Sequence, residues 1–510
     1  MIDFDEFRLR RFVERLIDLG EVEVHDEPVR LVDLSALIEA TDKASLFRRA
    51  GPEQCELVAA VSGGRRRVAA AFGVDVRQTS QEYLRRLENP RRVIEVASDT
   101  APVHEVVRTG DQIDLTKLPF FLQHELDGGP YISSAMDFSV DPATGRRNVG
   151  CRRLMLRDER TLTSNLTQPS DLKEIYRRCV ETKQELPVSF VIGSHPLDFL
   201  AATLRTESDD EVGLIAAMRG RPLPIVAGVT NNVWVPADAE LVIEGYFDAE
   251  GWRVPDGPYG EWWGFYGPTH PDPLFHVTAI TMRGDVLYQT VVHGTRQLER
   301  NDVSGAANVR VEADVWRVLQ AAQLEPAAVC HVASAPNGTQ VRVALRRGRP
   351  GQARRAIAEL FALPAVKHVT IVDDDIDVFS DAEVAWAQAT RLRPDRDVVI
   401  ESGFRTRLVV WDHTRAEDGT ISKIGFDATA PYDAPDDIEH WRPVPPRLKE
   451  RPAPYASVRE ALQAGPKFFI RLMEAVGSSD GREVALELER LRRAGLVDRL
   501  PNGEWRLAGD

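Results

Sequence analysis

The chain has 510 residues, of which 43% are hydrophobic and 28% are charged, and its formal net charge is −15. This composition is typical of a globular protein, and the length predicts about three domains at ~150 residues each. The negative charge argues against a protein that binds nucleic acid or an anionic membrane non-specifically, because both need a positive surface. The four cysteines form no CxxC pair and no apolar run is long enough to span a bilayer, so we expect a cytoplasmic protein with reduced thiols.

Residues 1–115 have the pattern of a mixed α/β domain. Apolar side chains at helical spacing predict a helix over residues 5–19, and a strand is expected at 21–24. Further along, Thr79 and Glu82 have the spacing of a capping box, which predicts that another helix starts there.

The pattern changes in the middle of the chain. Residues 116–305 contain short β-branched strands separated by turn signals, with one helix at about 171–184, which predicts a β-barrel or sandwich. Strands and helices alternate again over 306–445, as in a second α/β domain. Residues 446–510 are expected to form a Pro-rich linker and a small winged-helix-like tail that ends in a hairpin at Asn502-Gly503.

Glu261 is a candidate catalytic acid. It ends the turn GPYGE, in which proline and glycine fix the backbone and hold the carboxyl in place. The aromatic residues that follow, including Trp262 and Trp263, would desolvate a neighbouring carboxyl, which suits a general acid. The turn alone is equally typical of a protein surface, and the aromatic run is equally typical of a core or an interface.

Arg153 is a charged residue at the start of an apolar run. A buried arginine needs an anionic partner, which Asp256 or Glu261 could supply; strand alternation equally allows an outward-facing side chain. Asn148 and Glu244 offer oxygen ligands of the kind that Mg²⁺ or Mn²⁺ prefers when it bridges a phosphate.

Two further polar residues, Asp171 and Lys423, could be ligands but also have an ordinary structural explanation. Asp171 follows Ser170 at a good helix start, where an acid interacts favourably with the helix dipole. Lys423 lies among Gly, Ser and Thr residues, so it would either hold a phosphate or be exposed.

Five segments together resemble the UbiD family, the reversible decarboxylases that use prenylated flavin mononucleotide (FMN). They are NVGCRR, VPADAELVIEG, DGPYGEWWGFY, IVDDDIDVFSDAEVAWAQATR and SKIGFDAT, in the family's order and spacing. The resemblance covers residues 1 to about 440. It implies a mixed α/β fold: an N-terminal α/β domain, a central split β-barrel of the flavin-reductase type and a C-terminal α/β domain.

The resemblance also implies roles for individual residues. Arg153, Asp256 and Glu261 match the catalytic set, although the family often has Glu at the position of Asp256. Asn148, Asp171 and Glu244 match the ligands of a Mn²⁺ or Mg²⁺ ion on the flavin phosphate, with Asp171 in place of the usual His. The implied cofactor-binding residues are Asn148, Gly150, Cys151, Arg152, Arg153, Ser170, Asp171, Pro236, Glu244 and Lys423. The backbone at 230–236 would complete the phosphate site and a site for a monovalent cation such as K⁺.

The resemblance implies a non-oxidative, reversible decarboxylase of an aromatic, heteroaromatic or α,β-unsaturated carboxylic acid. Loss of CO₂ from an sp² carbon leaves a carbanion that no side chain can delocalise, so a cofactor must act as the electron sink; we expect Glu261 to donate the proton. A flavin prenyltransferase would supply the cofactor, and a homodimer or larger homo-oligomer is expected. The alternatives are a flavin-reductase-like oxidoreductase with ordinary FMN and a non-enzymatic regulator that acts through the tail.

Overall fold

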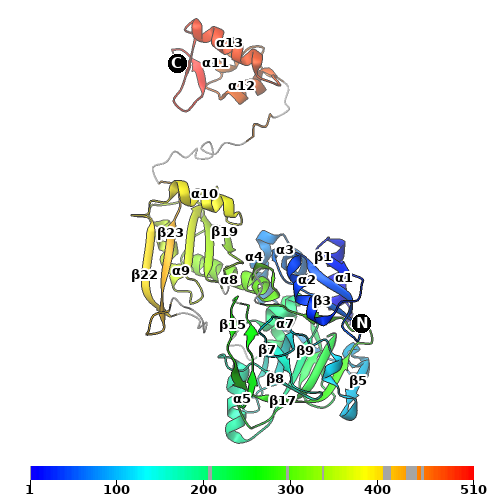
Figure 1. The fold of residues 1–510 in the computed structure, drawn as a ribbon. Helices are drawn as coiled ribbons and strands as arrows, with labels where there is room; N and C mark the ends of the chain where they lie inside the picture. The colour runs from blue at the N-terminus through cyan, green and yellow to red at the C-terminus, as the bar shows by residue number, and fades with distance from the viewer. Residues whose placement is uncertain are drawn as a thin grey trace. The chain divides into compact units, whose positions relative to one another are not determined.

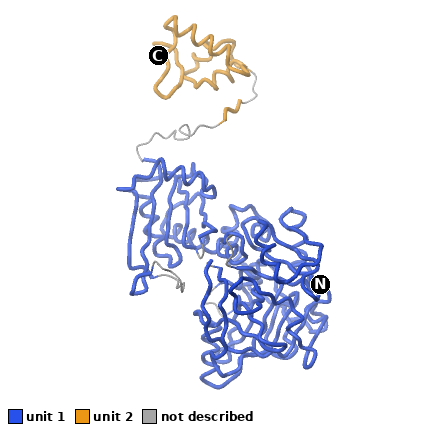
Figure 2. Tube along the Cα trace, viewed as in Figure 1, with its two compact units in different colours: residues 1–432 blue, residues 433–510 orange. Residues whose placement is uncertain are grey.

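The computed structural model describes residues 2–204, 210–262, 264–293, 298–335, 338–405, 415–431, 445–448 and 453–509. The chain divides into two compact units, residues 1–432 and 433–510 (Figure 2). Most of the predicted Pro-rich linker lies outside the described residues. Among the described helices, none is both long enough and apolar enough to cross a bilayer.

The N-terminal part contains a four-stranded sheet with the order β1-β2-β3-β18. Its strands are β1 (Val22–His25), β2 (Ala44–Ala50), β3 (Cys55–Ala59) and β18 (Tyr288–Thr290), and its helices are α1 (Leu9–Asp18), α2 (Leu34–Ala40), α3 (Arg65–Phe72) and α4 (Thr79–Leu87). Helix α1 packs through Leu9, Phe12, Val13 and Leu16, which form one apolar stripe. The predicted helix over 5–19 and strand at 21–24 are therefore present with slightly different ends.

Two predictions for this part are wrong in detail. Thr79 is the first residue of α4 rather than its cap, and its hydroxyl donates to the carbonyl of Val76 at 2.9 Å, so no capping box forms with Glu82. The sheet is also not confined to residues 1–115, because β18 comes from the end of the barrel region and pairs in parallel with β3.

A β-barrel is formed by the middle of the chain (Figure 1). Six strands close the ring in the order β12-β9-β6-β7-β8-β17, because β17 pairs with β12 as well as with β8, and β5 extends β17 at the edge. The strands are β5 (Val106–Thr109), β6 (Tyr131–Val140), β7 (Arg147–Leu156), β8 (Thr161–Ser164), β9 (Leu186–Ile192), β12 (Leu241–Phe247) and β17 (Leu274–Met282). The barrel is thus the predicted one, and its interior is filled by apolar side chains such as Phe190, Ile243 and Phe275.

Helices and short ribbons surround the barrel. The helices are α5 (Asp171–Thr182), α6 (Pro196–Ala202) and α7 (Glu211–Arg219); the short strands are β4 (Val93–Glu95), β10 (Leu223–Ala227), β11 (Trp234–Pro236), β13 (Val254–Asp256), β14 (Tyr259–Gly260), β15 (Tyr266–Gly267) and β16 (His270–Asp272). β13 pairs with β16 and β14 with β15, so two small ribbons carry the sequence around Asp256 and Glu261. Short 3-10 turns occur at Leu31–Asp33, Val76–Gln78, Ser98–Thr100, Pro102–His104, Gly110–Gln112, Leu115–Lys117 and Leu298–Arg300.

The C-terminal α/β part begins with the long helix α8, which is capped by the side chain of Asn301. Its elements are α8 (Asp302–Ala321), β19 (Pro326–His331), β20 (Gln340–Leu345), α9 (Gln352–Phe361), β21 (His368–Asp373), α10 (Asp381–Arg391), β22 (Val398–Arg405) and β23 (Thr420–Asp427). The sheet has the order β19-β20-β21-β23-β22. Helices α8 and α9 share one apolar cluster with the sheet and α10 shares another, so helices cover both faces.

The tail has a core of its own, built from residues such as Leu462, Leu472 and Leu488. It consists of α11 (Val458–Gln463), α12 (Phe469–Val476), α13 (Arg482–Arg493) and the hairpin of β24 (Val497–Arg499) and β25 (Trp505–Leu507). The tail thus contains three helices followed by a hairpin.

Candidate active site

The structure brings the three predicted catalytic residues together. Arg153 lies on β7, Asp256 at the end of β13 and Glu261 just after β14. Nη2 of Arg153 is 3.2 Å from Oδ1 of Asp256, and Nη1 forms an ion pair with Oε1 of Glu261. The side chain of Asp256 is fully buried, whereas that of Glu261 is 24% exposed. The arginine therefore joins one inaccessible acid to one accessible acid.

Asp256 is held by more than the arginine. Its Oδ2 accepts a hydrogen bond from Oγ1 of Thr163 at 2.6 Å, and its Oδ1 accepts one from the hydroxyl of Tyr131 at 3.3 Å. Burial raises the pKa of Tyr131, so its hydroxyl stays a neutral donor at ordinary pH. Asp256 is thereby fixed as the anionic anchor of the group.

Arg153 stays charged in this buried position. Burial alone would lower its pKa, but the charges of Glu261 and Asp256 outweigh burial and raise the pKa above its ordinary value. The rings of Tyr259 and Tyr131 lie over the guanidinium, with centroids 4.3 and 5.8 Å from Cζ, and add cation–π attraction.

The aromatic surroundings differ from the expectation. Phe265, in the run after Glu261, is 53% exposed, and Trp263 lies outside the described residues. The rings at the ion pair instead come from Tyr131 on β6 and Tyr259 on β14. These two tyrosines were missed because no motif connects them with Arg153 in the sequence.

Two buried polar atoms beside this group have no partner among the described residues. They are Nε of Arg153 and Nδ1 of His293. The His293 ring lies 6.0 Å from the ring of Tyr259, and burial, assisted by His124 and Arg153, lowers the pKa of His293 to about 3. Buried donors and acceptors are normally paired, so these two atoms indicate a place for a polar ligand.

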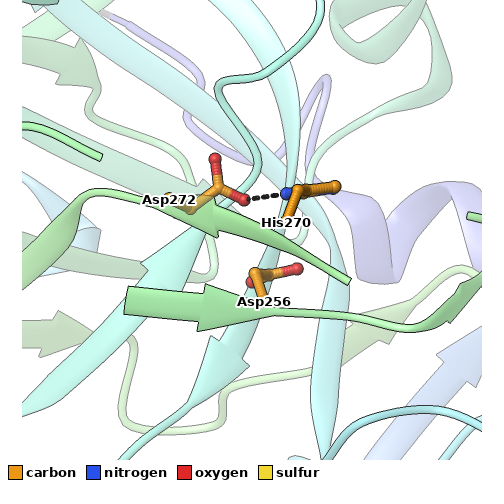
Figure 3. A group of neighbouring side chains, drawn as sticks. All are labelled: Asp256, His270 and Asp272. Atoms are coloured by element: carbon orange, nitrogen blue, oxygen red, sulfur yellow. Dashed lines mark ion pairs between the residues drawn. The ribbon is translucent and has the colours of Figure 1, made fainter. Parts of the chain in front are cut away.

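A second carboxylate lies behind Asp256. Figure 3 shows Asp256 on β13 and the pair His270 and Asp272 on β16, and Nδ1 of His270 is 2.8 Å from Oδ2 of Asp272. One nitrogen or oxygen atom of each residue lies within 4.8 Å of the others, a spacing that would suit a metal ion. However, Asp256 already accepts three hydrogen bonds, including one from the cation Arg153, which would repel a metal. Asp272 is also occupied, since its Oδ1 accepts a hydrogen bond from the backbone of Leu166 at 2.8 Å.

The implied flavin-binding stretch on β7 contacts β6 and the start of α5. Nδ2 of Asn148 donates to Oδ2 of Asp137 at 3.0 Å, and Nε of Arg152 lies 3.1 Å from Oδ1 of the same carboxylate. Nη2 of Arg152 also donates to Oγ of Ser170 at 3.3 Å. Cys151 points away from this group, since its Sγ lies 3.9 Å from the carbonyl of Phe199, and burial raises its pKa to about 12.

The expected metal ligand Asp171 lies beside a carboxylate that the sequence did not suggest. Nη2 of Arg146 is 3.2 Å from Oδ2 of Asp171 and 2.9 Å from Oε1 of Glu211. The other oxygen of Glu211 accepts a hydrogen bond at 2.8 Å from the backbone of Val149, next to Asn148. Burial raises the pKa of Glu211, while Val149 and Arg146 oppose that rise. Asp171 and Glu211 thus share one cationic partner, and Glu211 is bonded to the backbone of the residue next to Asn148.

Glu244 does not belong to this group. Its carboxylate is fully buried and accepts hydrogen bonds from the backbone of Val229 at 2.9 Å and from the backbone and hydroxyl of Thr230 at 2.8 and 2.9 Å. Asn148 lies on β7 and Glu244 on β12, which are not neighbours in the six-strand ring. Glu244 instead anchors the loop before β11.

Two other expected cofactor-binding residues, Lys423 and Pro236, make their contacts elsewhere in the structure. Nζ of Lys423 on β23 donates to the carbonyls of Phe361 and Leu363, each at 2.7 Å, and burial lowers its pKa to about 8. Lys423 therefore connects the sheet to the end of α9 and does not contact the Arg153 group. Pro236 is buried on β11, opposite Ile225 of β10.

Comparison with known proteins agrees with this arrangement. Two family models match: the 3-octaprenyl-4-hydroxybenzoate carboxy-lyase Rift-related domain over residues 94–296 and the C-terminal domain of the same carboxy-lyase over residues 306–428. An anhydromevalonate phosphate decarboxylase of Methanosarcina mazei is 28% identical over 425 residues, which are 82% of this chain and 95% of the relative.

Solved structures with the same fold contain flavin. The UbiD-class enzyme HmfF from Pelotomaculum thermopropionicum in complex with FMN is 31% identical, with a TM-score of 0.77, covering 86% of this chain and 97% of its own. An evolved dimeric form of that enzyme in complex with prenylated FMN is 30% identical, with a TM-score of 0.74, covering 83% and 95%. From the matching family models and these relatives, the chain belongs to the UbiD family of carboxy-lyases.

Proposed function

We propose that the chain is a non-oxidative, reversible decarboxylase of an aromatic, heteroaromatic or α,β-unsaturated carboxylic acid, with prenylated FMN as its cofactor. The observation that carries the proposal is the Arg153 group, in which a buried guanidinium joins Asp256 to the more accessible Glu261 and keeps one donor, Nε, without a partner. A free donor on a buried cation suits a carboxylate or a flavin.

The residues at the start of β7 fit a flavin phosphate with a divalent ion. Asn148, Asp171 and Glu211 offer one amide and two carboxylates, the oxygen ligands that Mn²⁺ and Mg²⁺ accept. Arg146 lies between Asp171 and Glu211, which supports a role for positive charge at this position. We therefore place Glu211, in place of Glu244, in the proposed ligand set. Gly150, Arg152 and Ser170 lie along the same stretch.

Each residue of the Arg153 group has a task in the proposed reaction. Bound prenylated FMN supplies the electron sink for the electron pair that the breaking carbon–carbon bond leaves behind. Arg153 orients the substrate carboxylate, and Asp256 keeps Arg153 in place. Glu261 donates the proton that replaces CO₂, because it is the acid of the pair that a substrate can reach.

The proposed function includes an enzyme that supplies the cofactor and further copies of this chain as partners. A flavin prenyltransferase would supply the cofactor. The evolved dimeric form of HmfF supports a homo-oligomer as the working state of this chain as well. A mass by light scattering that remains that of a monomer at all concentrations would contradict that state.

The test compares protein made with and without a co-produced flavin prenyltransferase. We expect an absorption spectrum that differs from that of FMN only in the first sample, and only that sample should release CO₂ from members of a panel of aromatic and unsaturated acids. In D₂O the product should carry deuterium at the carbon that lost CO₂. A protein that binds only ordinary FMN and oxidises a reduced nicotinamide would instead be the oxidoreductase considered from the sequence.

A further inference from the structure

Three residues on one face of β7 converge on a single carboxylate. Asn148, Gly150 and Arg152 alternate along the strand and therefore share a face. Asp137 of β6 is the cross-strand partner of Gly150, and its side chain is completely buried. Because these three residues alternate in the segment NVGCRR, they lie on the face of β7 that meets this one acid.

Both oxygens of Asp137 are engaged by the neighbours of Gly150. Oδ2 accepts the hydrogen bond from Nδ2 of Asn148 at 3.0 Å, and Oδ1 lies 3.1 Å from Nε of Arg152. Gly150 makes room for this approach, because a Cβ at that position would lie 2.7 Å from Oδ1 of Asp137. Arg152 places a positive charge beside this buried carboxyl group.

This arrangement decides which way the Asn148 amide points. Oδ2 of Asp137 accepts from the amide nitrogen of Asn148, so the amide oxygen is not the atom that faces this carboxyl group. The oxygen must then point to the other side, and among the described residues none donates a hydrogen bond to it. An amide oxygen is the atom of asparagine that binds Mn²⁺ or Mg²⁺.

We propose that Asp137 is a positioning residue that holds the amide of Asn148 with its oxygen directed at the metal. The inference rests on the proposed function, because it assumes that Asn148 is a metal ligand. Outer-shell partners that orient a ligand typically contribute ~10–100-fold to metal affinity. Asp137 would do so from the neighbouring strand without touching the ion.

The test measures binding of Mn²⁺ to the full chain with FMN present, and of FMN alone with the metal removed by a chelator. Asp137→Asn replaces the carboxylate by an amide of the same shape, which can donate as well as accept and no longer dictates the orientation of Asn148. We expect Mn²⁺ affinity to fall ~10–100-fold, while the metal-free affinity for FMN stays as in the parent. Asp141→Asn is the matched control: Asp141 is a buried acid four residues on that bonds Arg178 at 2.7 Å, and Mn²⁺ affinity should not change.

Two further variants keep the inference falsifiable. Gly150→Ala displaces the Asp137 carboxylate without removing it, so it should also weaken Mn²⁺ binding. This variant replaces Asp137→Asn in the test if Asp137→Asn does not fold. In an Asn148→Ala background, Asp137→Asn should cause no additional loss, because its effect passes through Asn148. Parental Mn²⁺ affinity in both folded Asp137→Asn and Gly150→Ala would overturn the inference. A parent protein that binds no Mn²⁺ with FMN would instead contradict the proposed metal site itself.

Discussion

Arg153 and Asp256 form a buried ion pair with 3.2 Å between Nη2 and Oδ1, although they are 103 residues apart in the sequence. The pair joins the barrel wall to the β13–β16 ribbon, so the position of the guanidinium depends on two separate parts of the barrel domain. Glu261 completes the group from a third segment. Substitutions of the two acids should therefore have different effects, although both contact the same arginine.

Glu261→Gln tests the proton donor. The amide keeps the shape and the hydrogen-bonding capacity of the side chain but cannot donate an acidic proton. Turnover and exchange of the product hydrogen with D₂O should fall ~10²–10⁴-fold, while flavin still binds. The measurement is product exchange followed by NMR in the reconstituted enzyme. If Glu261→Gln exchanged as fast as the parent while Asp256→Asn did not, the roles of the two acids would have to be reversed.

Glu211→Gln and Glu244→Gln separate the two candidate metal carboxylates. Loss of Glu211 should lower Mn²⁺ affinity by at least the ~10–100-fold that an outer-shell partner contributes. Glu244→Gln should leave Mn²⁺ affinity unchanged but destabilise the fold by about 1.5–3 kcal/mol, because the loop at 229–230 loses a hydrogen bond to a charged carboxylate. Calorimetric Mn²⁺ titrations and urea unfolding of both variants provide the readouts. The opposite outcome would return Glu244 to the ligand set.

Arg219→Met tests a buried ion-pair network that the sequence did not suggest. Nη2 of Arg219 is 2.5 Å from Oδ2 of Asp198, and its Nη1 is 2.6 Å from Oδ2 of Asp238. Removing the cation leaves two buried acids without compensation, which should cost about 3–5 kcal/mol in the free energy of unfolding. The control is Arg221→Met, since the exposed pair of Arg221 with Glu6 should contribute almost nothing. Equal midpoints of urea unfolding for the two variants would contradict this expectation.

Lys423 predicts a pH dependence of stability. Its pKa is about 8 in the folded chain because of burial, against about 10.4 for an unfolded lysine. Between these values the unfolded chain binds more protons, so this residue's contribution to stability rises as the pH goes from about 8 to about 10.4 and is lost below about 8. The stability of the parent relative to Lys423→Met should therefore increase over that range. Urea unfolding of both proteins at several pH values checks the sign, and a difference independent of pH would refute it.

The sequence predicted the barrel and the Arg153 group because both leave local signals. Short β-branched segments between turns predict strands directly, and a charged residue in an apolar strand, such as Arg153, requires an anionic partner. The motif around Glu261 then restricted where that partner lies. The local pattern left a sandwich and an outward-facing Arg153 open, and the resemblance to the UbiD family selected the barrel and the ion-paired arginine.

The carboxylate of the proposed metal site was harder to predict because two acids give similar sequence signals. Glu244 lies in an apolar strand, where a charge suggests a ligand, but its partners are backbone N–H groups of a loop, which have no signature in the sequence. Glu211 is the first residue of α7, where an acid is explained by the helix dipole alone. Only the tertiary contact with Val149 reveals its place beside β7.

The position of β18 has a consequence for how the chain folds during synthesis. β3 ends at Ala59, but its parallel neighbour is β18, whose last residue is Thr290. At a ribosomal rate of ~5–20 residues per second, the roughly 230 intervening residues take about 10–50 seconds to appear. During that time the edge of β3 is open to pairing with other chains. The nascent N-terminal sheet therefore needs protection until the barrel has been translated. Expression in chaperone-depleted cells should increase aggregation of the newly made chain.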